Sequence, residues 1–228
     1  MRHSNQDSIL IALKTRLFAV ADGMGGHAGG EIASQMCIDI FQKTFVEKIN
    51  QEPNDPQKAL FLALSDANLQ IYQKALEEPE LSGMGTTATC LYFQENRAYW
   101  AHVGDTRLYL IRRKFIYQLT NDHSLIEEKV KIGLLSNVEA RNHKLRNVIT
   151  RSIGYKAHEE IDFLSLEVLV GDYFIICSDG LHNKVADQEI CSLVLKEGTD
   201  AAENLIEKAN LRGGEDNISV IIIEVSEL

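Results

Sequence analysis

The order of the predicted elements indicates an α+β protein with an antiparallel β core and pairs of helices packed outside it. Two strand-like runs come first, followed by two long amphipathic helices, a series of strands, two more helices and a last strand. Because the helices do not alternate with the strands, a doubly wound parallel sheet does not fit. No internal repeat or low-complexity linker divides the 228 residues, so we expect a single domain over residues 1–228.

The first third of the chain predicts a hairpin and a helix pair. Two short apolar runs, Ser8–Leu13 and Leu17–Ala21, are separated by three polar residues, which is typical of a hairpin. Residues Glu31–Lys48 then carry apolar side chains at helical spacing. Asp55 and Pro56 form a strong helix start, an N-cap followed by proline at the first helical position. We expect the two helices to pair and to lie on a sheet.

From residue 86 the spacing of apolar side chains changes from the helical period to that of strands. An antiparallel meander is predicted from four segments: Thr86–Phe93, Arg97–Val103, Arg107–Ile111 and Phe115–Leu119. The polar segment Asn121–Asn147 is different, and indicates two short helical pieces in an insert. The remaining elements are strands at Ile161–Leu169 and Tyr173–Cys177, helices at Asp187–Lys196 and Thr199–Ala209, and a strand at Asn217–Val225.

Composition limits the classes of function. The net charge of −10 argues against nucleic acid and anionic membranes as partners. No apolar run approaches the ~20 residues that cross a bilayer, and no signal-peptide core follows the N-terminus, so a cytoplasmic protein is expected. None of the four cysteines has C-x-x-C spacing, and their apolar neighbours predict reduced, buried thiols: Cys37, Cys90, Cys177 and Cys191.

Aspartates stand at the ends of several predicted strands, and this repetition indicates a shared site. These residues are Asp22, Asp105, Asp179 and Asp216, with Asp7 beside the first strand. A single aspartate there is usually a turn residue, but carboxylates that converge repel one another unless cations lie between them. With no His/Cys cluster nearby, all-oxygen ligands favour Mg²⁺ or Mn²⁺. Two such ions can bridge and deprotonate a water for in-line attack on a phosphoryl group, which Arg2 is placed to contact.

A competing interpretation concerns the glycines after Asp22. The spacing Gly23-x-Gly25-x-x-Ala28 formally matches the dinucleotide-binding fingerprint, between a strand and a helix. Asp22 would place a negative charge beside a pyrophosphate, and the later chain lacks the βαβ units that form the binding crevice. We therefore disfavour nucleotide binding.

Other polar residues have simpler interpretations. Thr86 and Thr87 could support the carboxylate site, but threonine at the start of a strand is the expected residue type. His102 is predicted to be a hydrogen-bonded core histidine. His123 and His143 lie in the insert, where we expect solvated surface residues.

Taken together, these residues resemble the type 2C (PPM) family of metal-dependent serine/threonine protein phosphatases, in its compact bacterial form. The matching segments run almost from end to end: RHSNQDS (2–8), DGMGGHAGGE (22–31), GMGTTAT (83–89), HVGDTR (102–107), LTNDHS (119–124), ARNH (140–143), RNVITR (146–151), SDG (178–180) and GGEDN (213–217). Each is weak alone, but in this order over most of the chain they are specific.

The resemblance implies a four-layer αββα fold, a central β-sandwich of two antiparallel sheets flanked by pairs of antiparallel helices. It also implies two Mn²⁺ or Mg²⁺ ions bridged by Asp22, with the Gly23 carbonyl on the second ion, Asp179 and Asp216 on the first, and a third, weaker ion held by Asp105 with Asp179. Asp7 then acts through water or a second ligand layer, Arg2 binds the phosphate, and residues 121–147 form a flap beside the active site.

The implied activity is hydrolysis of phosphoserine and phosphothreonine in phosphoprotein substrates by a hydroxide bridging the two ions. The cognate partner is a serine/threonine protein kinase, and a monomer is assumed. The alternative is a non-catalytic phosphatase-like regulatory module; such a module would be expected to lose some of Asp22, Asp179 and Asp216, and all three are present.

Three departures from the family pattern stand out. Gln6 replaces a common glutamate, which removes one charge near the site. Met24 stands where eukaryotic members have a histidine proposed as general acid; His27 lies three positions later and is not assigned that role, so the proton donor stays open, with a metal-bound water as one option. The sequence also starts close to Arg2, so we expect either a shortened first strand or a truncated start.

Overall fold

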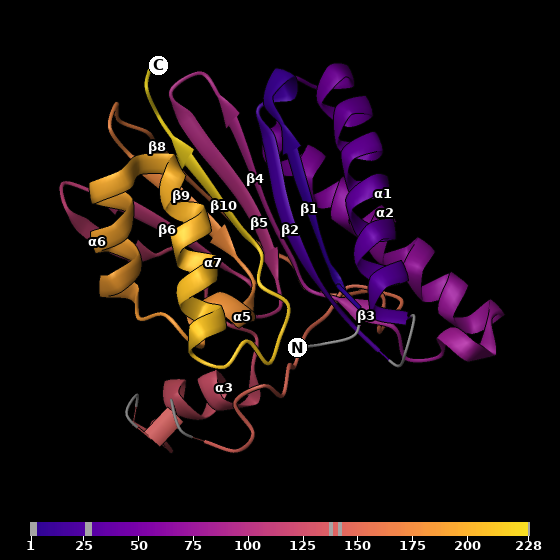
Figure 1. Ribbon diagram of the computed structural model, residues 1–228. Coiled ribbons are helices and arrows are strands. Elements are labelled where there is room, and N and C mark those ends of the chain that lie inside the picture. The colour runs from indigo at the N-terminus through magenta and orange to yellow at the C-terminus, as the bar shows by residue number, and fades with distance from the viewer. Residues whose placement is uncertain (1–3, 26–28, 137–138, 141–142, 228) are drawn as a thin grey trace.

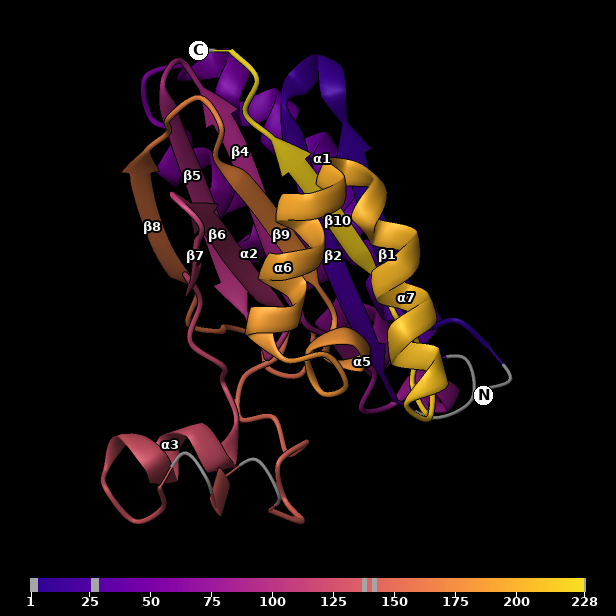
Figure 2. The ribbon, with the colours of Figure 1, turned by 60° about the vertical axis from the view of Figure 1, so that its left-hand side comes forward.

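Two antiparallel sheets lie face to face, and each carries a pair of helices on its outer side (Figure 1). The computed structural model describes residues 4–25, 29–136, 139–140 and 143–227. This arrangement confirms the predicted four-layer α+β fold. The insert that contains α3 stands away from the sandwich (Figure 2).

The larger sheet has the strand order β1-β2-β4-β5-β8, with β3 paired to β2. Its strands are β1 (Asp7–Ala12), β2 (Leu17–Met24), β3 (Gly85–Thr86), β4 (Ala88–Gln94), β5 (Arg97–Val103) and β8 (Asp162–Glu167). The smaller sheet has the order β10-β9-β6-β7, made of β6 (Arg107–Arg112), β7 (Phe115–Gln118), β9 (Tyr173–Cys177) and β10 (Val220–Glu224). The hairpin predicted at the N-terminus is the β1–β2 pair.

The helices cover the outer faces of the two sheets. Long helices α1 (Gly29–Gln51) and α2 (Pro56–Glu77) pack on the larger sheet, and α6 (Asp187–Glu197) and α7 (Ala201–Leu211) pack on the smaller one. Two short helices are α3 (Leu125–Lys131) and α5 (Asp179–His182), and the 3-10 turns are η1 (Leu13–Thr15), η2 (Pro79–Leu81) and η3 (Gly198–Asp200). The predicted N-cap is confirmed, because the Asp55 carboxylate accepts a hydrogen bond from the Lys58 amide at 3.0 Å.

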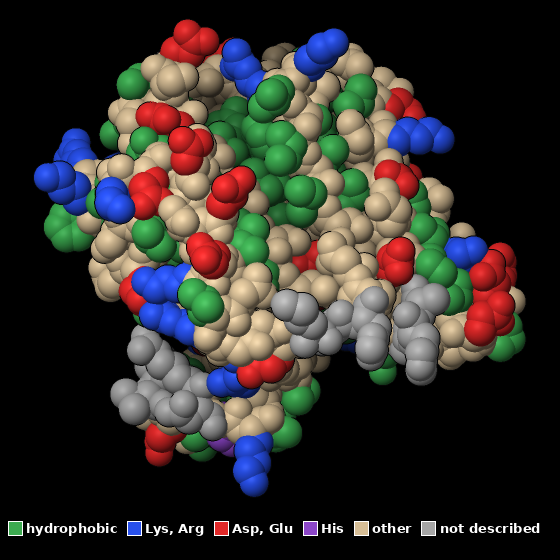
Figure 3. Space-filling view, in the orientation of Figure 1, with side chains coloured by type: hydrophobic (Ala, Val, Ile, Leu, Met, Phe, Trp, Pro, Cys, Tyr) green, Lys and Arg blue, Asp and Glu red, His purple; other side chains and the backbone are tan. Residues whose placement is uncertain are grey.

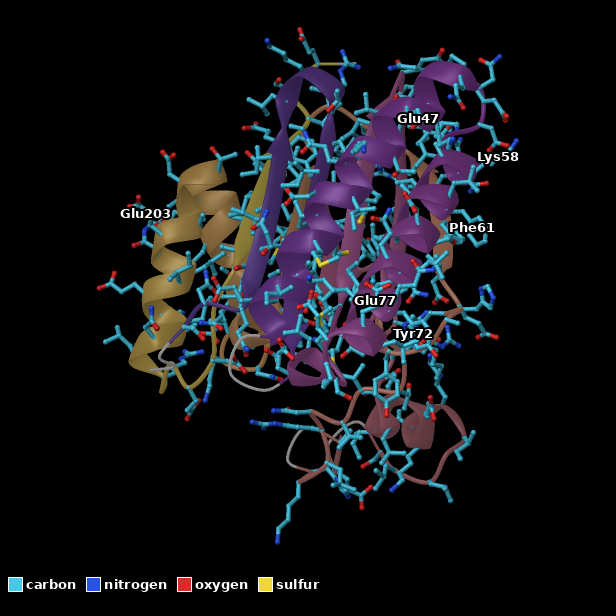
Figure 4. The ribbon with its side chains drawn as sticks, turned by 90° about the vertical axis from the view of Figure 1, so that its right-hand side faces the viewer. Glu47, Lys58, Phe61, Tyr72, Glu77 and Glu203 are labelled. Atoms are coloured by element: carbon cyan, nitrogen blue, oxygen red, sulfur yellow. The ribbon has the colours of Figure 1, made fainter. Side chains whose placement is uncertain are left out.

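Hydrophobic side chains fill three layers between these elements. Phe41 and Leu64 represent the layer between α1, α2 and the larger sheet. Trp100 and Phe174 lie between the two sheets, and α6 and α7 bury the third layer against the smaller sheet. The outer face of α1 and α2 carries charged side chains such as Glu47 and Lys58 (Figure 4), as expected for an amphipathic pair.

The predicted meander is wrong at one connection. Strands β5 and β6 follow each other in sequence but belong to different sheets. The chain crosses between the sheets at Gly104, whose φ of 110° suits glycine. A Cβ on Gly104 would lie 2.5 Å from the Thr87 side chain, so this turn packs closely against the larger sheet.

Other expectations need smaller adjustments. The strand predicted at Thr86–Phe93 is interrupted at Thr87, which separates β3 from β4. The final strand begins at Val220 rather than at Asn217, and a short helix, α5, follows Ser178. All four cysteines are buried and free, as predicted. Among the described residues, no helix is long and apolar enough to span a bilayer.

Strand β1 exposes apolar side chains at the edge of the sandwich. Ile9 and Ile11 lie opposite Val20 and Phe18 of β2, and therefore on the face that is turned to the smaller sheet. They are nevertheless 49% and 53% exposed, because the smaller sheet ends at β10. Hydrophobic side chains accordingly line a hollow on this side of the molecule (Figure 3).

Candidate metal centre

Asp22 lies near the C-terminal end of β2. This end of β2 lies at the same end of the sandwich as α5 (Figure 1). Asp22 pairs with Asp7 of β1, so the two carboxylates leave the same face of the sheet as direct neighbours. The Gly23 amide donates to the Gln6 carbonyl at 3.0 Å. A Cβ on Gly23 would overlap the Gly30 carbonyl, so only glycine allows the start of α1 to pass this close to β2.

Asp179 and Asp216 reach the same end of the molecule from the smaller sheet. Asp179 follows β9 as the first residue of α5, and Asp216 lies in the loop before β10. A Cβ on Gly180 would overlap the Asn217 carbonyl, so the two loops are in direct contact. The Asn183 side chain donates to Asp179 Oδ2 at 3.1 Å, and the Asn217 amide donates to Asp216 Oδ1 at 2.7 Å.

Asp105 lies in the turn that carries the chain from one sheet to the other. Its side chain is buried, and its carbonyl accepts a hydrogen bond from His182 Nε2 at 3.0 Å. Burial lowers the pKa of His182 to about 3, so this imidazole is neutral and holds the turn as a hydrogen-bond donor.

The electrostatics show that the five carboxylates converge. Burial, followed by repulsion from Asp7, Asp179, Asp105 and Asp216, raises the pKa of Asp22 well above its usual value. Burial and the neighbouring Asp179 raise the pKa of Asp105 to about 8. Burial also raises the pKa of Asp7. The structure thus brings together all five aspartates that the sequence marked.

The donor set of this cluster fits a hard divalent cation. All its side-chain donors are carboxylate oxygens, and a cation would relieve the repulsion that raises their pKa values. Asp7 Oδ1 is buried and has no hydrogen-bond partner in the part of the chain that the structure describes. Among the same residues, no three His, Cys, Asp or Glu side chains group tightly enough to hold an ion by themselves. Backbone carbonyls and water would therefore complete the shell, as Mg²⁺ and Mn²⁺ commonly require.

A buried threonine network supports Asp22, a role that the sequence allows for Thr87 but disfavours against that of an ordinary strand residue. The Asp22 amide donates to Thr87 Oγ1 at 2.9 Å, and the Thr87 amide returns a bond to the Asp22 carbonyl. Thr87 Oγ1 also lies 2.5 Å from Thr106 Oγ1, beside the Asp105 turn. Thr87 therefore connects two of the carboxylate-bearing segments. The only sequence signal was its position at the start of a strand, which does not reveal a partner 65 residues away.

Replacing Thr87 with valine is expected to loosen Asp22 while keeping the shape of the side chain. The variant leaves the Asp22 amide without its acceptor, which should cost about 1–3 kcal/mol of unfolding free energy and weaken Mn²⁺ binding about 10- to 100-fold. Urea unfolding and Mn²⁺ titration measure the two effects. Thr44→Val is the matched control, because Thr44 is also buried and hydrogen-bonded, to the Asp66 carboxylate, but on the helix pair. Equal Mn²⁺ affinity in both variants would contradict this role of Thr87.

Two histidines near the cluster, His102 and His123, are both buried and hydrogen-bonded. His102 is a hydrogen-bonded core histidine, as predicted, with Thr89 on Nδ1 and the Asn121 carbonyl on Nε2. Burial lowers its pKa to about 4. The prediction of a solvated His123 is wrong: this residue is 6% exposed. Its Nδ1 accepts the Gly104 amide at 3.1 Å, so it holds the same turn that carries Asp105.

The insert is anchored to the sandwich by a further residue that the sequence did not single out. Asp122 accepts three hydrogen bonds from the Arg107 guanidinium, of which the shortest are 2.9 Å to Oδ1 and 2.7 Å to Oδ2. Arg107 begins β6, two residues after Asp105. The base of the predicted flap therefore contacts the segment that bears one of the carboxylates. His143, expected on a solvated surface, is half-buried within the insert.

Two residues named from the sequence, Arg2 and His27, lie outside the described residues. Gln6 is described: its amide donates to Asn217 Oδ1 at 3.0 Å and its side chain to the Gly25 carbonyl at 3.4 Å. The dinucleotide interpretation of the glycine segment is wrong, because β2 enters an antiparallel sheet rather than a parallel βαβ unit.

Comparison with known proteins shows the same architecture. A family model described as protein phosphatase 2C matches residues 3–218. Protein phosphatase PhpP of Streptococcus pneumoniae is 38% identical over 213 residues, which cover 92% of this chain and 86% of that protein. The crystal structure of the Mycobacterium tuberculosis serine/threonine phosphatase PstP/Ppp has a TM-score of 0.91 at 36% identity, covering 100% of this chain and 94% of that one. A structure of the catalytic domain of PstP in complex with 2 manganese ions has a TM-score of 0.87 at 35% identity, with the same coverage.

These matches define the class of protein as a phosphatase, and hence a hydrolase. The chain belongs to the protein phosphatase 2C family.

Proposed function

We propose that this protein hydrolyses phosphoserine and phosphothreonine in other proteins, and that it does so with two Mn²⁺ or Mg²⁺ ions. The observation that carries the proposal is the convergence of Asp22 with Asp7, Asp105, Asp179 and Asp216 at one end of the sandwich. The serine/threonine specificity rests on similarity to relatives such as PstP, whose name is serine/threonine protein phosphatase. The use of manganese is supported by similarity to the PstP catalytic domain, whose crystal structure is a complex with 2 manganese ions.

The proposed roles follow the resemblance to the type 2C family, and the position of each residue is compatible with them. Asp22, central in the cluster, would serve both ions, and the Gly23 carbonyl would serve the second. Asp179 and Asp216, whose loops touch through Gly180 and Asn217, would hold the first ion. Asp105, next to Asp179, would hold a third, weaker ion with it, and Asp7 acts through water.

Bound ions would supply an activated water and the positive charge that offsets the phosphoryl oxygens. The protein contributes the positions of the donors. Strand pairing and the Thr87 hydroxyl fix the backbone of Asp22, and the Asn183 side chain orients the carboxylate of Asp179. Arg2 is proposed to bind the substrate phosphate, and the segment 121–147 to act as a flap that influences access. The proton donor to the leaving alkoxide stays open: His182 is neutral and already donates to the Asp105 carbonyl.

The cellular setting is part of the same proposal. The substrates would be phosphoproteins made by a serine/threonine protein kinase of the same cell. We propose that the protein acts in the cytoplasm, as a monomer, in signalling. Its net charge of −10 does not favour nucleic acid as a partner.

Hydrolysis of a phosphothreonine peptide and of a small aryl phosphate by the full chain tests the proposal. We expect activity with Mn²⁺ and none with excess EDTA. Absence of activity, together with Mn²⁺ binding, would favour a non-catalytic regulatory module. Activity that is unchanged by EDTA would overturn the metal-dependent chemistry.

A further inference from the structure

Ser178 lies where three carboxylate-bearing segments of the chain meet. It is fully buried and stands between β9 and Asp179. Its hydroxyl donates to Asp7 Oδ2 at 2.8 Å, across 171 residues of sequence. Ser178 Oγ also accepts a hydrogen bond at 3.0 Å from the backbone amide of Ser219, the residue before β10. One hydroxyl therefore connects the start of β1 with the end of β9 and the start of β10.

This contact gives the two oxygens of Asp7 different environments. Oδ2 is occupied by the Ser178 hydroxyl, whereas Oδ1 is buried and has no hydrogen-bond partner within the described part of the chain. Asp7 as a whole is only 8% exposed, so bulk water does not reach it freely. A buried carboxylate oxygen without a partner is costly, unless a bound ion or an ordered water satisfies it.

The hydroxyl also fixes the direction of the carboxylate. Rotation about the Cβ–Cγ bond of Asp7 would break the hydrogen bond at Oδ2, so this contact restrains the carboxylate, which neighbours Asp22 across the β1–β2 pair. Ser178 can make this bond because its backbone is itself locked, with its amide donating to the Ser219 carbonyl at 3.0 Å. The Ser219 amide restrains this hydroxyl further, because it donates to the Ser178 oxygen.

We propose that Ser178 is a positioning residue that directs Asp7 Oδ1 toward the two divalent metal ions, or toward a water bound to them. Ser178 does not touch the ion or the substrate; it acts through Asp7. This inference rests on the proposed function, because it assumes that divalent ions occupy the carboxylate cluster. The inference adds Ser178 to the proposed site, a residue that the pattern of aspartates does not identify.

Mn²⁺ binding to the metal-free full chain tests the proposal without relying on activity. We expect Ser178→Ala to raise the dissociation constant for Mn²⁺ about 10- to 100-fold, as loss of a residue that orients a ligand commonly does. Isothermal titration or electron paramagnetic resonance measures the constant. Ser34→Ala is the matched control: Ser34 is equally buried and hydrogen-bonded, to Ser8 and to the Glu31 carbonyl on α1. It should bind Mn²⁺ like the wild type.

A double-mutant cycle with Asp7 separates positioning from general destabilisation. If Ser178 acts through Asp7, then Ser178→Ala in an Asp7→Asn background should weaken Mn²⁺ binding no further than Asp7→Asn alone. The proposal would be overturned if Ser178→Ala weakened Mn²⁺ binding by the same factor with Asp7 and with Asn at position 7. Wild-type Mn²⁺ affinity in Ser178→Ala would also overturn it.

If Ser178→Ala does not fold, Ser178→Cys carries the test, because a thiol of similar size is a weak donor. The cysteine variant should also bind Mn²⁺ less tightly, and unchanged affinity would again reject the role of Ser178. Wild-type protein that binds no Mn²⁺ would count against the proposed function instead, so the two failures are distinguishable.

Discussion

Asp22→Asn is expected to lower kcat/KM for a phosphothreonine peptide at least about 100-fold, more than the loss of any single orienting residue. Asp22 faces all four other carboxylates of the cluster, so its replacement affects every ion position at once. The amide keeps the size of the side chain and can still lie beside Asp7, so the fold should persist. Steady-state kinetics at saturating Mn²⁺ measures the effect.

Asp200→Asn is a suitable control for the same chemical change. Asp200 lies in the 3-10 turn before α7, at the opposite end of that helix from the loop that carries Asp216, and makes no side-chain cap. Its replacement should leave kcat/KM unchanged. Full activity of Asp22→Asn would remove Asp22 from the proposed mechanism.

Chelation of divalent ions is expected to abolish activity and to lower stability more at high pH than at low pH. The raised pKa of Asp105, about 8 against its usual 3.8, means that the metal-free folded chain keeps a proton that the unfolded chain has lost. The unfolding free energy of the metal-free protein should therefore be highest below the unfolded pKa and fall as the pH rises toward 8. A bound cation displaces that proton, so Mn²⁺ should restore more stability at pH 8.5 than at pH 6.5.

Urea unfolding at pH 6.5, 7.5 and 8.5, with EDTA or with excess Mn²⁺, measures this dependence. Free Mn²⁺ at 100 times its dissociation constant adds about 2.7 kcal/mol. Below pH 6.5 the buried His102 and His182 have the opposite effect. Their pKa values are lowered in the folded chain, so the unfolded chain gains protons first and the unfolding free energy falls as the pH falls. Asp105→Asn should flatten the slope above pH 6.5. Equal stabilisation by Mn²⁺ at all three pH values would contradict the coupling between Asp105 and the bound ions.

The sequence predicts the elements of this fold well where the signal is local. The Asp55-Pro56 start of α2 and the strand Tyr173–Cys177 appear as expected, because a cap and a short apolar run are encoded by adjacent residues. The assignment of β5 and β6 to different sheets could not be predicted in this way. It depends on which strands pair across long distances, and on Gly104 packing against Thr87.

The same distinction applies to the candidate site. The five aspartates could be selected because each follows or starts an apolar strand, and the structure brings them together. The residues that hold them could not be assigned: the sequence allows a supporting role for Thr87 but disfavours it, and does not mark Ser178 as a support. The roles of Thr87 and Ser178 depend on partners 65 and 171 residues away, and the burial of His123 depends on the turn at Gly104. Serine, threonine and histidine are ordinary in loops and strand starts, so their types alone carry no such information.

The number of Mn²⁺ ions bound by each chain tests the central claim, that one cluster with Asp22 at its centre binds two ions together. Native mass spectrometry of the metal-free protein titrated with Mn²⁺ counts them directly. The wild type should bind two Mn²⁺ ions tightly and a third only at higher concentration. The Asp22→Asn variant should lose both tightly bound ions. Two tightly bound ions in Asp22→Asn, or none in the wild type, would contradict it.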